Sequence, residues 1–254
     1  MKLAAFLIAL FSFYLIIASP IDAAADVASI TLHPGENWIA APLVPFNPDP
    51  VDMFSGFNID GKLSRFDVPS QSLVSYTTAN SSAFGNVLLG DGYKVYNSTS
   101  TSVVINYNGV ADGVPGSEGP TDMWISLPGD NTDGQNNGGI HWIGQPFNHN
   151  TAVESMYVLY ESNLASVLEA VNLGWIDQLW LGFDGETQKS FTAGLSVFGA
   201  DENYFRAGHM YEIVTHKDDL ALIIPSTPYV PEPSSLLSLL ALAPLAIGFI
   251  KRRS

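Results

Sequence analysis

Several segments of this chain occur twice, and this internal similarity restricts the fold more than any other feature of the sequence. The paired segments are residues 37–42 with 141–146, 65–67 with 182–184, 89–95 with 207–213, and 103–105 with 221–223. The first pair is separated by 104 residues, the second by 117 and the last two by 118. Because near-constant offsets over several segments rarely arise by chance, we expect two tandem copies of one module.

Short apolar segments follow each other in the same order in both copies. The expected strands cover residues 63–67, 72–77, 93–96 and 103–106 in the first copy, and 211–215 and 220–224 in the second. Large and polar side chains alternate in these segments, as in strands with one face in water. Gly90 and Gly208 precede the tyrosine-containing strands, where a turn needs a positive φ or a close backbone approach. The expected fold class is mainly β, with two tandem duplicated sandwich- or barrel-like modules.

The copies are expected at residues 26–110 and 140–226, joined by a linker rich in Gly, Asp and Asn at 111–139. The change of offset from 104 to 117 places about thirteen extra residues in the second copy. Apolar side chains there recur at three- and four-residue spacing, which predicts a short helix over 162–172 that Gly174 ends. Residues 156–160 before that helix are compatible with a strand as well.

The N-terminus carries the pattern of an export signal. A basic start is followed by an apolar run over residues 3–18, and Ala23 and Ala25 then form an A-x-A cleavage pattern. We expect residues 1–25 to be a signal peptide and the mature chain to begin at Asp26. An uncleaved anchor is the alternative, because the apolar run is long for a signal peptide.

The C-terminus carries a second apolar segment, residues 236–250, which contains no charge. Nine of its fifteen residues are Leu, Ile or Phe, and at about −0.3 to −0.6 kcal/mol each they favour membrane insertion by roughly 3 to 5 kcal/mol. At about 1.5 Å per residue the segment spans about 22 Å, which is short of a hydrocarbon core of about 30 Å. We therefore expect a marginal transmembrane helix, with the basic cluster Lys251, Arg252 and Arg253 on the cytoplasmic side.

Pro231, Glu232 and Pro233 stand immediately before this segment. The motif, the short apolar helix and the basic end, in this order at the end of the chain, resemble the PEP-CTERM sorting signal of exported bacterial proteins. The resemblance covers residues 227–254, about a tenth of the chain. It implies an exosortase-like enzyme that recognises the Pro-Glu-Pro motif and removes or exchanges the helix. An ordinary tail anchor is the alternative.

The same resemblance implies where the body of the protein works. It implies export, attachment to the membrane at the cell surface, and release to the outer surface or the extracellular polysaccharide of a Gram-negative-type bacterium. The leading expectation is therefore a structural or adhesive surface protein. A calcium- or carbohydrate-binding surface module is the second, and a glycoside-active enzyme the third.

The net charge of the chain excludes nucleic acid as a partner, and the absence of cysteine excludes disulfides and thiolate metal sites. Between the two terminal segments stand six basic and twenty-three acidic residues, a net charge of about −17. Such a surface repels nucleic acid and anionic lipid and attracts cations or basic partners. The chain has no cysteine, so disulfides and thiolate metal sites are excluded.

The best candidate for a cation site is the run of Asp, Asn and Gly over residues 130–139, with Asp130 and Asp133 as carboxylate ligands. Clustered carboxylate and amide oxygens suit a hard cation such as calcium. Gly134 interrupts the alternation that an EF-hand-type loop needs, and no Glu follows it. A solvated turn is therefore the favoured interpretation, and no cofactor is expected apart from this calcium hypothesis.

The tryptophans divide into two groups. Trp38 and Trp142 occupy equivalent positions in both copies, which favours a place in the core. Trp124, Trp175 and Trp180 are not duplicated and are the candidates for exposed rings that stack on sugars.

Evidence for catalysis is weak. The chain has no Gly-x-Ser-x-Gly elbow, no His-Glu-x-x-His motif and no phosphate-binding loop. Asp67 and Asp184 are duplicated and could form the carboxylate pair of a glycosidase. A residue repeated at the same strand end more often makes a turn hydrogen bond, so no catalytic residue is assigned and an enzyme is not favoured.

Overall fold

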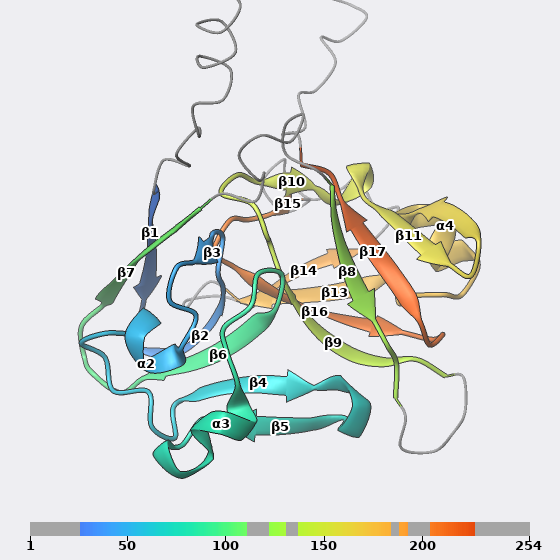
Figure 1. Ribbon diagram of the computed structural model, residues 1–254. Coiled ribbons are helices and arrows are strands. Elements are labelled where there is room, and N and C mark those ends of the chain that lie inside the picture. Colours follow the sequence, from blue (N-terminus) through green and yellow to red (C-terminus); the bar gives the residue numbers. More distant parts are fainter. Residues whose placement is uncertain (1–25, 111–121, 131–136, 184–187, 193–203, 227–254) are drawn as a thin grey trace, which may run out of the picture.

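The computed structural model describes residues 26–110, 122–130, 137–183, 188–192 and 204–226. The fold is mainly β, as the sequence predicts, and its few helices are short (Figure 1). Residues 26–110 are called the first half below, and residues 122–226 the second half. Each half has its own hydrophobic core, and a small third cluster lies where the halves meet.

The first half contains two antiparallel sheets, with strand orders β1-β7-β3 and β2-β6-β4-β5. Its strands are β1 (Asp26–Leu32), β2 (Gly35–Ala40), β3 (Val44–Pro45), β4 (Leu63–Asp67), β5 (Ser72–Ser75), β6 (Gly92–Asn97) and β7 (Val103–Val110). Its helical turns are α2 (Pro50–Met53), η1 (Val68–Ser70), η2 (Thr78–Asn80) and α3 (Ser81–Phe84).

The second half repeats this plan and adds to it. Its larger sheets have strand orders β12-β11-β17-β8 and β14-β13-β16-β9, and β10 pairs with β15. The strands are β8 (Met123–Leu127), β9 (Gly139–Gly144), β10 (Thr151–Ala152), β11 (Tyr157–Tyr160), β12 (Asn163–Ser166), β13 (Leu179–Phe183), β14 (Gln188–Thr192), β15 (Tyr204–Phe205), β16 (Met210–Thr215) and β17 (Leu220–Ile224). The helices are η3 (Val153–Ser155) and α4 (Val167–Asn172).

Six strands of the first half have counterparts in the second half. The order β2-β6-β4-β5 corresponds to β9-β16-β13-β14, and the pair β1-β7 corresponds to β8-β17. Inward-facing Ile30 opposes Ile105 in the first pair, as Ile125 opposes Leu222 in the second. The expected strands over residues 63–67 and 220–224 have the predicted bounds, and Gly90 and Gly208 have φ values of 84° and 79°.

The segment over residues 111–139 is not a linker throughout, because the strand β8 lies within it. Ile125 and Leu127 of β8 are buried in the second core, opposite Leu222 and Leu220 of β17. This strand is hard to predict from the sequence, because it has only five residues and because glycines, prolines and acidic residues stand on both sides of it. The second half therefore begins at β8, and not at residue 140.

The predicted helix over residues 162–172 is also shorter than expected. Residues 163–166 form β12, which pairs with β11 so that Leu164 lies opposite Leu159. The helix α4 begins only after Ser166, where a capping box joins Ser166 and Glu169. Gly174 follows α4 with a φ of 69°, as expected. Strand pairing in a hairpin thus outweighs the helical spacing of the apolar residues in the first part of the segment.

Candidate functional site

The contact between the halves is built from residues that the sequence repeats. The N–H of Ala40 donates to the carbonyl of Gly208 (3.0 Å), and the N–H of Gly144 donates to the carbonyl of Gly90 (2.8 Å). Ala40 and Gly144 are 104 residues apart, and Gly90 and Gly208 are 118 apart, which are the offsets of the repeat. Equivalent strand ends therefore make reciprocal hydrogen bonds across a pseudo-two-fold arrangement.

A lysine lies between two tryptophans at this contact. The Nζ atom of Lys94 lies 4.2 Å from the ring centroid of Trp38 and 4.3 Å from that of Trp142. Each indole also packs on a phenylalanine of the opposite half, Trp38 on Phe183 and Trp142 on Phe66. Trp38 and Trp142 are each 8% exposed, which confirms their predicted place in the interior.

The indole N–H groups are satisfied by carboxylates. Trp38 Nε1 donates to Glu36 (2.6 Å), and Trp142 Nε1 donates to Glu212 (2.9 Å). Glu212 occupies the position in the second half that Lys94 occupies in the first. The centre of the contact thus combines a cation over two ring faces with acceptors at both ring edges.

Two pockets of similar size flank this centre and follow the same pseudo-symmetry. The Arg65 pocket, of about 210 Å³, is lined by Arg65, Phe66, Asp91, His141, Trp142 and one edge of β8. The His209 pocket, of about 220 Å³, is lined by His33, Asn37, Trp38, Phe183, His209 and one edge of β1. Each pocket is therefore walled by the first two strands of one half and by the glycine turn of the other.

The polar residues of the Arg65 pocket interact weakly with one another. Arg65 reaches the carboxylate of Asp67 at 3.9 Å and the carbonyl of Ala83 at 3.5 Å, while its buried Nε has no acceptor among the described residues. Asp91 accepts a hydrogen bond from Tyr93 at 3.5 Å. Loss of water by burial raises the pKa of Asp91, and the charge of Arg65 partly offsets this.

His141 forms the buried side of the Arg65 pocket. Its ring is 2% exposed, and Nε2 lies 3.1 Å from the hydroxyl of Thr215. Burial lowers the pKa of His141 to about 4, so the imidazole is neutral at pH 7. Asn37 stands at the equivalent position of the first half, where it holds the β1–β2 turn through hydrogen bonds with His33.

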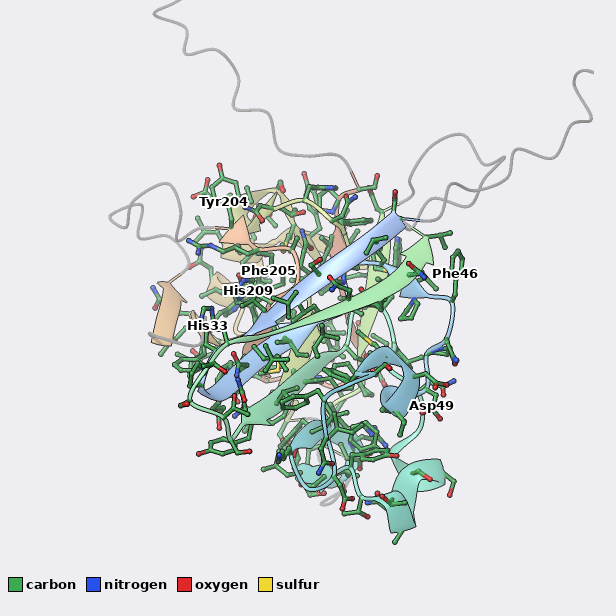
Figure 2. All side chains as sticks on the ribbon, turned by 90° about the vertical axis from the view of Figure 1, so that its left-hand side faces the viewer. His33, Phe46, Asp49, Tyr204, Phe205 and His209 are labelled. Atoms are coloured by element: carbon green, nitrogen blue, oxygen red, sulfur yellow. The ribbon has the colours of Figure 1, made fainter. Side chains whose placement is uncertain are left out.

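The His209 pocket is formed by equivalent backbone positions, but the side chains at these positions differ from those of the Arg65 pocket. Figure 2 shows His33 and His209 on one side of the molecule, and both line this pocket. His209 takes the place of Asp91, and Gly182 takes the place of Arg65. Among the described residues, the lining of this pocket has no carboxylate or guanidinium.

A separate feature is the outer face of the sheet β12-β11-β17-β8, called the Trp124 face below. It is formed by Trp124, Tyr157, Leu159, Leu164, Ala221 and Ile223. Trp124 is 58% exposed, Leu164 59% and Tyr157 44%. None of the four strands contains a charged residue, although the whole chain has a net charge of −15.

The equivalent face of the first half is mostly polar, although it also carries the exposed Val27 and Val104. In the strand pairing Trp124 takes the place of Ser29 and Ile223 that of Asn106, so β17 matches β7 at an offset of 117 and the predicted match of residues 103–105 with 221–223 is wrong by one residue. The Ser29 hydroxyl donates to the Asn106 side chain (2.6 Å). A strand pair of the same geometry is therefore stable in water with polar side chains on this face. The Trp124 face is thus the more apolar of the two faces, and its exposed Trp124, Tyr157 and Leu164 form an apolar patch.

Only one of the three predicted sugar-stacking tryptophans is exposed. Trp175 is 9% exposed and packs on Tyr160, and Trp180 is 1% exposed and packs on Phe205. The expectation that the Trp175 and Trp180 rings are exposed to solvent is wrong. They occur in one half only because that half has the larger core, which the inserted strands β11 and β12 help to form. Trp124 is exposed as expected.

The predicted cation site remains a hypothesis. The N–H of Asp130 donates to the carbonyl of Gly138 (2.7 Å), whereas Asp133 lies outside the described residues. Within the described part of the chain, no group of three or more His, Asp and Glu side chains has the arrangement of a metal site.

Other predicted residues fall outside the described ranges. These are Ala23 and Ala25 of the expected cleavage site, Pro231, Glu232 and Pro233 of the sorting motif, and the basic cluster Lys251, Arg252 and Arg253. In the described ranges, no helix has the length and apolar character needed to span a bilayer. The expected helix over residues 236–250 stays a prediction.

Duplicated Asp67 makes a local contact. Its carboxylate accepts a hydrogen bond from Ser70 in the turn after β4, while Asp184 lies outside the described residues.

Comparisons with protein-family models, with curated proteins and with solved structures found no match.

The sequence alone did not single out Arg65, Asp91, His141 or Tyr157. The repeat contained the signal for the first three, because aligned positions with unlike residues, such as Asp91 and His209, mark where the halves differ. Tyr157 could not be assigned, because its exposure depends on β11 joining the sheet beside β17.

Proposed function

We propose that this chain is an exported protein with a structural or adhesive role at the cell surface or in the extracellular matrix. Its body consists of two copies of one sandwich- or barrel-like β module, joined by duplication. The matched strand orders and the reciprocal contacts of Ala40 and Gly144 support this origin. An exosortase-like enzyme processes the PEP-CTERM-like end after a helix over residues 236–250 has held the protein in the membrane.

The positions of the described ends agree with this attachment. In Figure 1, β1 begins and β17 ends on the same upper side of the molecule. The described part of the chain therefore begins and ends on one side of the body. A membrane anchor at that side would leave the opposite side of the body open to solvent.

The single observation that carries the adhesive role is the Trp124 face. A body with a net charge of about −17 repels anionic surfaces and other copies of itself. An uncharged patch with exposed Trp124, Tyr157 and Leu164 can contact a neutral partner without that repulsion. Aromatic side chains give large contact areas at low entropic cost, as in other recognition surfaces.

Carbohydrate binding is the second candidate, and the same patch favours it. Trp124 and Tyr157 lie on either side of Ile223 in one row across three strands. Their Cα atoms are thus about 10 Å apart, two interstrand spacings. Two rings on a flat face suit an extended neutral polysaccharide, which makes extracellular polysaccharide the favoured partner.

Replacing Trp124 and Tyr157 with alanine should reduce retention of the protein in the extracellular matrix by at least tenfold. The measurement is the fraction of full-length protein that remains with washed matrix from the native host. Losing two exposed aromatic contacts of about 1 kcal/mol or more each is enough for this change.

Asn106→Ala, on the equivalent face of the first half, is the matched control and should leave retention unchanged. Unchanged retention in the Trp124→Ala/Tyr157→Ala variant would refute the adhesive role of this face. A glycan array then separates the candidates, because binding that depends on Trp124 identifies a polysaccharide as the partner.

A further inference from the structure

The Arg65 pocket has the size and shape of a site for one small molecule. Its volume of about 210 Å³ is below the roughly 300–1,000 Å³ of pockets for drug-sized ligands. At roughly 30 Å³ for each water, it has room for about seven waters or for one sugar-sized ring. Both halves contribute to its wall, so the site exists only in the assembled body.

Three charged side chains line this pocket: Arg65 makes a long ion pair with Asp67 (3.9 Å), and Asp91 pairs with neither of them. Arg65 and Asp91 influence each other electrostatically, but they do not approach within the 4.0 Å of an ion pair. Arg65 has five N–H donors, and its two described polar contacts are 3.5 and 3.9 Å long. Asp91 accepts one side-chain hydrogen bond, at 3.5 Å. Both groups therefore have hydrogen-bonding capacity that the protein itself does not use.

The charges around the pocket select the class of ligand. An anion would meet the carboxylates of Asp67 and Asp91, and a cation would meet Arg65. His141 is neutral at pH 7 and adds no charge. A molecule that fits has no net charge, accepts hydrogen bonds from the guanidinium, and donates them to the carboxylate. Hydroxyl groups do both.

We propose that the Arg65 pocket binds a single neutral sugar residue whose hydroxyls bridge Arg65 and Asp91. Phe66 and Trp142 provide the apolar wall for its C–H groups. The O–H groups of the sugar replace the water that Asp91 has lost on burial. This site is independent of the Trp124 face and adds a second point of contact with carbohydrate.

The His209 pocket is the internal control for this site. It has the same backbone and nearly the same volume, and it retains the aromatic pair as Trp38 and Phe183. It has Gly182 and His209 where the Arg65 pocket has Arg65 and Asp91. At the equivalent positions the described residues thus form the hydroxyl-bridging pair in the Arg65 pocket and not in the His209 pocket.

Calorimetric titration of the full-length protein with glucose, galactose, mannose and N-acetylglucosamine tests the proposal, with glucuronate and calcium chloride as charged comparators. At least one neutral sugar should bind saturably. Arg65→Met and Asp91→Asn should each weaken this binding by tenfold or more, because each removes hydrogen bonds to a charged group. His209→Asn, in the equivalent pocket, should leave it unchanged.

Hydrogen exchange of the wild type gives a test that does not depend on how the variants fold. Bound sugar should slow exchange in the turn of residues 90–92 and leave the equivalent turn of residues 208–210 unchanged. The proposal is overturned if no neutral sugar binds, if glucuronate or calcium binds in preference, or if both pocket variants bind normally. Such a result would leave the retention experiment on the Trp124 face unaffected.

Discussion

Replacing Gly144 with alanine should lower the free energy of unfolding by about 2 to 3 kcal/mol, as expected for overpacking a close contact. A Cβ at this position would lie 2.2 Å from the Cβ of Ala40 and 2.7 Å from the carbonyl oxygen of Asp91. Neither neighbour is the end of a flexible side chain, so the two halves would have to move apart. Urea unfolding of the full-length protein measures the loss.

The pseudo-symmetry supplies the control for this experiment. Ala40 is the equivalent of Gly144, so exchanging the two residues keeps one methyl group at the contact. The double variant Ala40→Gly/Gly144→Ala should recover more than half of the loss. Additive losses from the two substitutions would contradict the reciprocal packing of Ala40 and Gly144.

Acid should destabilise the protein through His141. Its pKa falls from 6.5 to about 4 on folding because the ring is buried. The native state therefore binds its proton less tightly than the unfolded state. The stabilising contribution is fully present above pH 6.5 and is lost as the pH falls from 6.5 to about 4. At about 1.36 kcal/mol for each pH unit, the loss is about 3 kcal/mol.

His141→Asn isolates this contribution, because asparagine stands at the equivalent position of the first half as Asn37. The variant should show a flatter dependence of unfolding free energy on pH between 6.5 and 4. Asp91 acts in the opposite direction, since its raised pKa makes the native state bind a proton more tightly. Equal slopes for wild type and variant would show that His141 is not held neutral by burial.

The sequence predicted those parts of the fold that depend on local pattern and on the repeat. The bounds of β4 and β17, the positive φ of Gly90 and the burial of Trp38 follow from alternation, turn chemistry and equivalence between the copies. The reciprocal contact of the halves could not be predicted, because an offset shows that segments are alike but not that they touch.

The misassigned elements have a shared physical cause. The strand β8 is short, and its pairing with β17 spans almost a hundred residues. The burial of Trp175 and Trp180 likewise depends on strands added to the second core. The Arg65 pocket combines residues from β4, the turn before β6, β8 and β9, so only the assembled body brings Arg65 and Asp91 of the first half beside His141 and Trp142 of the second.

Mass spectrometry of both ends of the mature protein, isolated from its native host, tests the proposed export and sorting most directly. We expect an N-terminus at Asp26 and a C-terminus near Pro233, in material recovered from the cell surface or the matrix. An intact chain from Met1 to Ser254 in the cytosol would contradict it.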